Sequence, residues 1–82
     1  MALAEIQRLA QLDRIRYVRH ARDRMAERGA TPADVRNTLL TATAAVWQPE
    51  RSNWRVRGVD CAGDDLTAVV DLEADVIIVT IF

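Results

Sequence analysis

Two arginines at alternating positions of a predicted strand are the side chains in this sequence best suited to chemistry. Arg55 and Arg57 flank Val56, and residues two apart in a strand project from the same face of a sheet. Adjacent guanidinium groups can bind phosphate oxygens bidentately and stabilise a pentacoordinate phosphorane. We therefore predict that Arg55 and Arg57 are catalytic, phosphate-binding residues. The alternative is that they pair with Asp71 or Glu73 across the sheet.

A histidine with arginines at helical spacing forms a second candidate cluster. Arg24 lies four residues after His20, and Glu27 or Arg28 lies on the same helix face about one turn later. Such a histidine can exchange protons while the arginines stabilise phosphoryl charge. This spacing favours His20 as a catalytic acid/base residue, with Arg24 and Arg28 as substrate ligands. The alternative is a histidine packed at a helix start beside a solvated, ion-paired face.

Two tryptophans and one further arginine lie close in sequence to the arginine strand. Trp47 or Trp54 can provide a surface on which a nucleic-acid base stacks. We assign Trp54 and Arg51 to substrate binding. The alternative is that both tryptophans fill space in or beside the core.

Several other chemistries are excluded by what the sequence lacks. It has no glycine-rich phosphate loop and no nucleophile elbow, and one histidine with one cysteine cannot form a typical zinc site. Asp64 and Asp65 fit a solvated turn better than a cation site. Cys61 is interpreted as an incidental thiol. We expect neither a metal nor a cofactor.

Length and composition predict one small domain. The chain has 82 residues, of which 50% are hydrophobic and 28% charged, so residues 1–82 should form a single α+β domain around one core. No apolar run approaches the roughly 18 residues that span a membrane. The N-terminus lacks a basic region followed by an apolar one, which argues against a secretory signal. A cytoplasmic protein with no membrane partner is therefore expected.

The charges are divided unevenly along the chain. Residues 1–57 contain all eleven arginines and six acids, whereas residues 58–82 contain six acids and no base. An anionic partner such as RNA suits the first part. The opposite charges of the two parts also suit binding to another protein or to a second copy of the chain.

Helical signals are concentrated in the first half of the chain. Apolar residues recur at three-residue spacing over residues 2–12, which predicts an amphipathic helix. Residues 15–19 are rich in β-forming types and predict a short strand or an extended link. A second helix is predicted over residues 20–28, ended by Gly29 in a left-handed conformation.

The third predicted helix, over residues 32–40, has the clearest start. Thr31 is suited to the N-cap, Pro32 to the first helical position, and Asp34 to closing a capping box. The buried positions of this helix should be Val35, Leu39 and Ala42, and its outward positions Arg36 and Asn37.

After Thr43 alternation replaces helical periodicity. Strands are predicted over residues 45–48, 54–58, 66–72 and 76–82. The last is nearly continuously aliphatic and should lie inside the sheet, covered by the helices. The predicted fold is therefore α+β, with two or three N-terminal helices packed on one face of an antiparallel sheet of three or four strands.

Residues 19–29 contain the pattern H-A-x-x-R-M-x-x-R-G. Together with Trp54-Arg55-Val56, the turn at residues 63–67 and the terminal residues 79–82, this pattern resembles a bacterial family known as a domain of unknown function. The resemblance covers nearly the whole chain and implies one domain, without implying a mechanism.

The order of the predicted elements is also similar to that of the MqsR and RelE group of toxin ribonucleases. This resemblance implies a RelE/MqsR-like fold and a metal-independent mRNA interferase of a toxin–antitoxin system, in which a 2′-hydroxyl attacks the adjacent phosphate. It implies a catalytic role for Gln48, a phosphate-stabilising role for Arg55 or Arg57, and an antitoxin partner. The lysines and tyrosine of the MqsR site have no counterpart, because the chain has no lysine and Tyr17 precedes the main strands.

Two hypotheses of function follow. The first is a toxin-like endoribonuclease acting on RNA; its catalytic residues would be His20, Gln48, Arg55 and Arg57, and its substrate-binding residues Arg24, Arg28, Arg51 and Trp54. The second is a non-catalytic regulatory module of the same fold that binds a protein partner or forms a homo-oligomer. Salt discriminates between them, because RNA binding weakens steeply with salt concentration.

Overall fold

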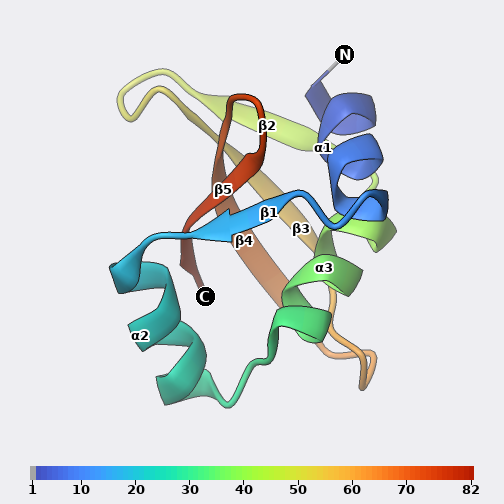
Figure 1. Ribbon diagram of the computed structural model, residues 1–82, viewed down its shortest axis with the longest axis vertical. Coiled ribbons are helices and arrows are strands. Elements are labelled where there is room, and N and C mark those ends of the chain that lie inside the picture. Colours follow the sequence, from blue (N-terminus) through green and yellow to red (C-terminus); the bar gives the residue numbers. More distant parts are fainter. Residues whose placement is uncertain (1) are drawn as a thin grey trace.

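The structure is a computed structural model and describes residues 2–82; Met1, the first residue of the predicted domain, lies outside them. Within these residues, three helices and a five-stranded sheet form an α+β fold, as predicted (Figure 1). The sheet order is β1-β5-β4-β3-β2. The elements are α1 Ala2–Gln11, β1 Ile15–Tyr17, α2 Arg19–Arg28, α3 Pro32–Thr41, β2 Ala45–Gln48, β3 Asn53–Val59, β4 Asp65–Leu72 and β5 Val76–Ile81.

The sheet differs from the predicted three or four antiparallel strands because β1 is a fifth strand and runs parallel to β5. Ile15 is opposite Val76 in this pair. The N–H of Val76 donates to the carbonyl oxygen of Arg14 at 3.0 Å, and the Arg14 and Asp75 side chains form an ion pair at 2.8 Å. A three-residue strand is too short to show alternation, and its partner is the last strand of the chain. Local periodicity therefore could not reveal this pairing.

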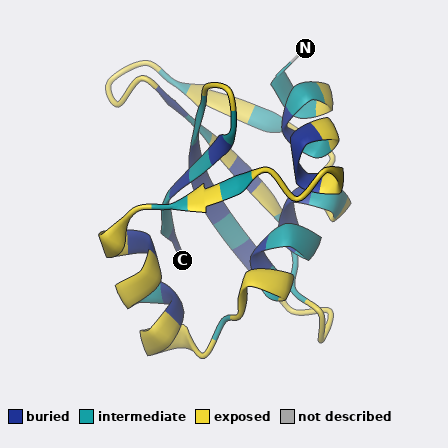
Figure 2. Ribbon diagram, viewed as in Figure 1, coloured by how far each residue is buried: buried dark blue, intermediate teal, exposed yellow. Residues whose placement is uncertain are grey.

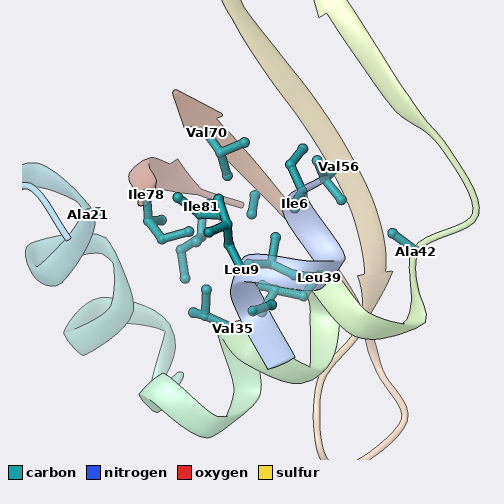
Figure 3. Packing of buried hydrophobic residues seen from close by; sticks show 14 of the residues in the cluster. Ile6, Leu9, Ala21, Val35, Leu39, Ala42, Val56, Val70, Ile78 and Ile81 are labelled. Carbon is teal, nitrogen blue, oxygen red and sulfur yellow. The ribbon is translucent and has the colours of Figure 1, made fainter. Parts of the chain in front are cut away.

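One hydrophobic core lies between the sheet and the helices. The large side chains that are fully buried in it come from α1, α3 and the sheet and include Ile6, Leu9, Val35, Leu39, Val56, Val70 and Ile78 (Figure 3). β5 lies between β1 and β4, which confirms the interior position predicted from its aliphatic sequence. α2 packs against β5 through Ala21 and Met25 and otherwise exposes most of its surface (Figure 2). The helices thus leave one face of β3 uncovered.

The predicted helices agree with the structure to within one residue at each end, with Leu12 just outside α1. Gly29 ends α2 with a φ of 66°, in the left-handed region that glycine adopts without strain. Thr31 and Asp34 form the capping box of α3, in which the Thr31 hydroxyl accepts from the Asp34 N–H at 3.1 Å. The Asp34 carboxylate also accepts from the N–H of Cys61 at 3.0 Å. It therefore ties the start of α3 to the β3–β4 loop.

Replacing Asp34 with alanine should lower the free energy of unfolding at pH 7, and the difference from wild type should disappear in acid. The N–H groups of Thr31 and Cys61 lower the pKa of Asp34 from 3.8 to about 2, so folding favours the ionised form. This contribution is present above about pH 4 and is lost as the pH falls towards 2. Urea unfolding between pH 2 and pH 7 measures it. Asp64→Ala removes a nearby exposed charge as a control; equal effects of both variants would contradict the assignment.

The expectation that Arg36 and Asn37 face outward is wrong. Arg36 donates to the carbonyl oxygens of Ala10 at 2.8 Å and Gln11 at 3.3 Å, so it caps the C-terminal end of α1. The Asn37 amide donates to the carbonyl oxygen of Val59 at 3.1 Å. Periodicity identified the apolar stripe of Val35, Leu39 and Ala42 correctly. It could not show that polar residues beside the stripe bond to the backbone of neighbouring elements.

Candidate anion-binding site

The side chains of β3 alternate between a face covered by the helices and a face that is not. Val56 is fully buried in the core, whereas Arg55 and Arg57 are exposed on the opposite face. We call this opposite side the arginine face. Across it, Val46 of β2 is opposite Arg55, and Thr67 of β4 is opposite Arg57. The alternation therefore places the two arginines as the sequence predicted.

A pocket of about 600 Å³ lies on the arginine face. Three arginines line it: Arg28 from the last turn of α2, and Arg55 and Arg57 from β3. α2 packs against β5 (Figure 1). Arg28, in the last turn of α2, thereby lines the same pocket. The other lining residues are Thr43, Ala44, Val46, Asp65, Thr67 and Phe82. This arginine pocket thus collects three positive charges and one negative charge.

Asp65 binds one of the pocket arginines. Its carboxylate accepts a hydrogen bond from Arg57 Nη2 at 2.7 Å, and both side chains are largely exposed. An exposed ion pair of this kind contributes little to stability, so an anionic ligand can displace it. Within residues 2–82, Arg55 forms no ion pair. The alternative partners considered from the sequence, Asp71 and Glu73, do not pair with either strand arginine.

The predicted cluster on α2 is only partly assembled at the pocket. Arg28 lines the pocket, but His20 and Arg24 do not. His20 is exposed in the first turn of the helix. Arg24 pairs with Glu27 at 3.9 Å, and its Nε is buried without a hydrogen-bond partner in the described part of the chain. The spacing predicted which residues share a helix, and could not predict which of them meets the sheet.

The other three candidates, from the β2–β3 hairpin, lie outside the arginine pocket. The Gln48 amide donates to Asn53 Oδ1 at 2.8 Å, next to the turn that contains the exposed Arg51. Trp54 alternates with Arg55 and therefore lies on the helix-covered face. There its ring centroid is 4.9 Å from that of Trp47. The alternative that the tryptophans fill space beside the core describes Trp54 better than a role in stacking beside the arginines.

Sequence reasoning missed six of the nine residues that line the pocket, and the three that matter for its chemistry are Asp65, Thr67 and Phe82. Alternation correctly predicted Thr67 as a strand residue of β4. Phe82, predicted as the last residue of the final strand, lies one residue beyond the end of β5 and still pairs with Thr67 through two backbone hydrogen bonds. Strand register was not visible, and register alone decides that Thr67 lies between Phe82 and Arg57. Asp65 was interpreted only as part of a solvated turn.

The fold and site define a small α+β domain with an arginine-lined pocket on the uncovered face of a mixed sheet. The chain belongs to the family described as Domain of unknown function (DUF4258), which matches residues 17–82. The predicted resemblance to a domain-of-unknown-function family is thereby confirmed. Comparisons with curated proteins and with solved structures gave no match, so the resemblance to the MqsR and RelE group stays a prediction.

Two further features bear on the expected function classes. From Ala2 to Phe82, no helix is long and apolar enough to cross a membrane. No group of three or more histidine, cysteine and acidic side chains in this range is arranged to hold a metal ion. Partial desolvation and the neighbouring carboxylate of Asp34 raise the pKa of the Cys61 thiol, which disfavours the reactive thiolate.

Proposed function

We propose that this protein binds RNA phosphates in the arginine pocket and acts as a toxin-like, metal-independent endoribonuclease of the mRNA interferase type. The observation that supports this most directly is the convergence of Arg28, Arg55 and Arg57 on one pocket. Guanidinium groups form paired hydrogen bonds to phosphate oxygens. Such contacts supply much of the affinity of proteins for nucleic acids. An antitoxin is the proposed protein partner.

The proposed reaction is attack of a ribose 2′-hydroxyl on the adjacent phosphorus. A bond forms between O2′ and phosphorus, the bond from phosphorus to O5′ breaks, and the products are a 2′,3′-cyclic phosphate and a 5′-hydroxyl. Positioned arginines stabilise the negative charge that develops on the phosphorane oxygens. One proton leaves O2′ and one is delivered to O5′, so the site needs a proton acceptor and a proton donor.

Asp65 is the proton acceptor in this proposal. It is the one carboxylate lining the arginine pocket within the described residues, whereas the acid/base candidate from the sequence, His20, lies outside. Its contact with Arg57 at 2.7 Å puts the Asp65 carboxylate within reach of the proposed phosphate site. Both side chains are exposed to solvent, so water delivers the proton to O5′.

Asp65→Asn separates catalysis from binding in the proposed site. Wild-type protein should cleave single-stranded RNA in EDTA and leave 2′,3′-cyclic ends. The cleavage rate of the variant should be lower by a factor of about 100 or more. Its affinity for uncleavable 2′-O-methyl RNA should rise a few-fold, because a negative charge leaves the pocket. End mapping and fluorescence anisotropy measure the two effects.

The matched control is Asp64→Asn, which removes a charge from the adjacent exposed residue outside the pocket and should leave both quantities unchanged. Cleavage by Asp65→Asn at the wild-type rate would exclude Asp65 as the acceptor. Wild-type protein that binds RNA without cleaving it would retain only the binding part of the proposal. Absence of both activities would overturn it.

An exposed, uncharged edge strand of the sheet supports a second function, that of a non-catalytic protein-binding module. β2 is an edge strand without charged residues, and its Val46 and Trp47 are 49% and 46% exposed. Uncharged edges with exposed apolar side chains pair readily with strands of other chains. Association with a partner or a second copy that resists salt, together with no binding of RNA, would favour this function over the first.

A further inference from the structure

We propose that the arginine pocket takes a single-stranded segment of RNA, and that the ring of Phe82 is the platform on which one base stacks. The inference rests on the proposed RNA-binding function. It adds the form of the substrate and a residue that contacts the base, where the arginines contact only phosphates.

Phe82 combines a fixed backbone with a free ring. Its N–H donates to the carbonyl oxygen of Thr67, and its carbonyl oxygen accepts from the Thr67 N–H, both at 2.9 Å. Its side chain lines the pocket, is 48% exposed and does not belong to the hydrophobic core. The backbone of Phe82 therefore has a defined position, and about half of its surface remains open to a ligand in the pocket.

The register of the sheet sets the spacing between this platform and the phosphate-binding groups. Thr67 pairs with Phe82 on one side and with Arg57 on the other. The backbones of Phe82 and Arg57 are thus two strand spacings apart, about 10 Å. The long arginine side chain covers part of this distance, and a ribose can lie between the ring and the guanidinium. Arg28 of α2 also lines the pocket. α2 packs on β5, the strand that Phe82 follows (Figure 1).

The platform is what selects a single strand. Arginines bind the phosphates of single-stranded and duplex RNA alike, because both forms present them outward. An aromatic ring can stack only on a base that is free of its neighbours, as in loops and single strands. A pocket of about 600 Å³ also suits a ligand of the size of a nucleotide better than a helix.

The test compares wild type with Phe82→Ala and Phe82→Trp. The probes are a short 2′-O-methyl RNA single strand, the same sequence as a blunt duplex, and inorganic phosphate. Wild type should prefer the single strand. Phe82→Ala should weaken single-strand binding about tenfold or more, and Phe82→Trp should retain it. Phosphate affinity and thermal unfolding should not change, because the arginines and the core are intact. Leu12→Ala removes an exposed apolar side chain elsewhere and should have no effect.

Three outcomes would overturn the inference and leave RNA binding by the arginines in place. These are equal single-strand binding by wild type and Phe82→Ala, tighter binding of the duplex by wild type, or an equal loss of phosphate and RNA affinity in Phe82→Ala. Failure of wild type to bind RNA in either form would instead overturn the proposed function on which the inference rests.

Discussion

Replacing Arg55 and Arg57 together with alanine should reduce the affinity for single-stranded RNA by about 100-fold or more. A hydrogen bond to a charged group contributes on the order of 1.5–3 kcal/mol, and about 1.4 kcal/mol corresponds to a factor of ten. The fold should be retained, because both side chains are exposed and the surface pair with Asp65 adds little stability. The slope of log affinity against log salt should fall by about 1.4 when two phosphate contacts are lost.

The matched control is the double variant Arg22→Ala, Arg51→Ala. It removes the same charge from exposed arginines outside the arginine pocket, and Arg51 also tests a candidate from the sequence. We expect a much smaller loss of affinity. Anisotropy titrations of 2′-O-methyl RNA at several salt concentrations measure both variants. Equal losses would show that RNA responds to net charge alone, which would contradict a defined phosphate site.

The same two double variants test the prediction in bacterial cells. If the protein is a toxin, induced expression of the wild type should arrest bacterial growth, and the variant lacking Arg55 and Arg57 should not do so at equal abundance. The control lacking Arg22 and Arg51 should still arrest growth. Unimpeded growth with abundant soluble wild-type protein would favour the protein-binding module that the exposed edge of β2 suggests.

Local signals were sufficient where a short stretch of chain decides its own conformation. Gly29 and Thr31 mark helix ends because a left-handed residue and an N-cap are requirements of the backbone within a few residues. The alternation around Val56 placed Arg55 and Arg57 on one face for the same reason. These signals gave the helices, four of the strands and the two arginines that the proposal rests on.

The remaining parts of the site depend on pairings between distant segments. Arg28 reaches the pocket because α2 packs against β5, and Phe82 because β5 pairs with the start of β4. Neither contact can be predicted from hydrophobic periodicity, because each joins segments that are far apart in the sequence. His20 is the opposite case. Its residue type and its spacing from Arg24 suited a catalytic role, but α2 packs so that His20 does not line the pocket.

The position of β3 itself depends on how closely α3 approaches it. At Gly58 a side chain on the helix-covered face would fall onto the carbonyl oxygen of Thr38 and lie 2.6 Å from the Thr41 hydroxyl. One residue later, the Thr41 hydroxyl accepts from the N–H of Val59 at 3.0 Å. The helix is thus in contact with the strand backbone, and glycine is what allows this. The contact lies beside Arg57 and fixes the end of the strand that presents it.

Gly58→Ala should therefore lower the free energy of unfolding by roughly 3 kcal/mol, at the upper end of overpacking costs, because the obstructing atom at Thr38 belongs to the backbone. For a domain of this size the midpoint of thermal unfolding should fall by roughly 12 to 24 °C. Circular dichroism measures it. Gly63→Ala is the control: with a φ of +87° and no atom within 4 Å, only backbone strain of about 1–2 kcal/mol applies. A Gly58→Ala protein as stable as wild type would show that α3 does not hold β3 in this way, and the arginine pocket would lose its support.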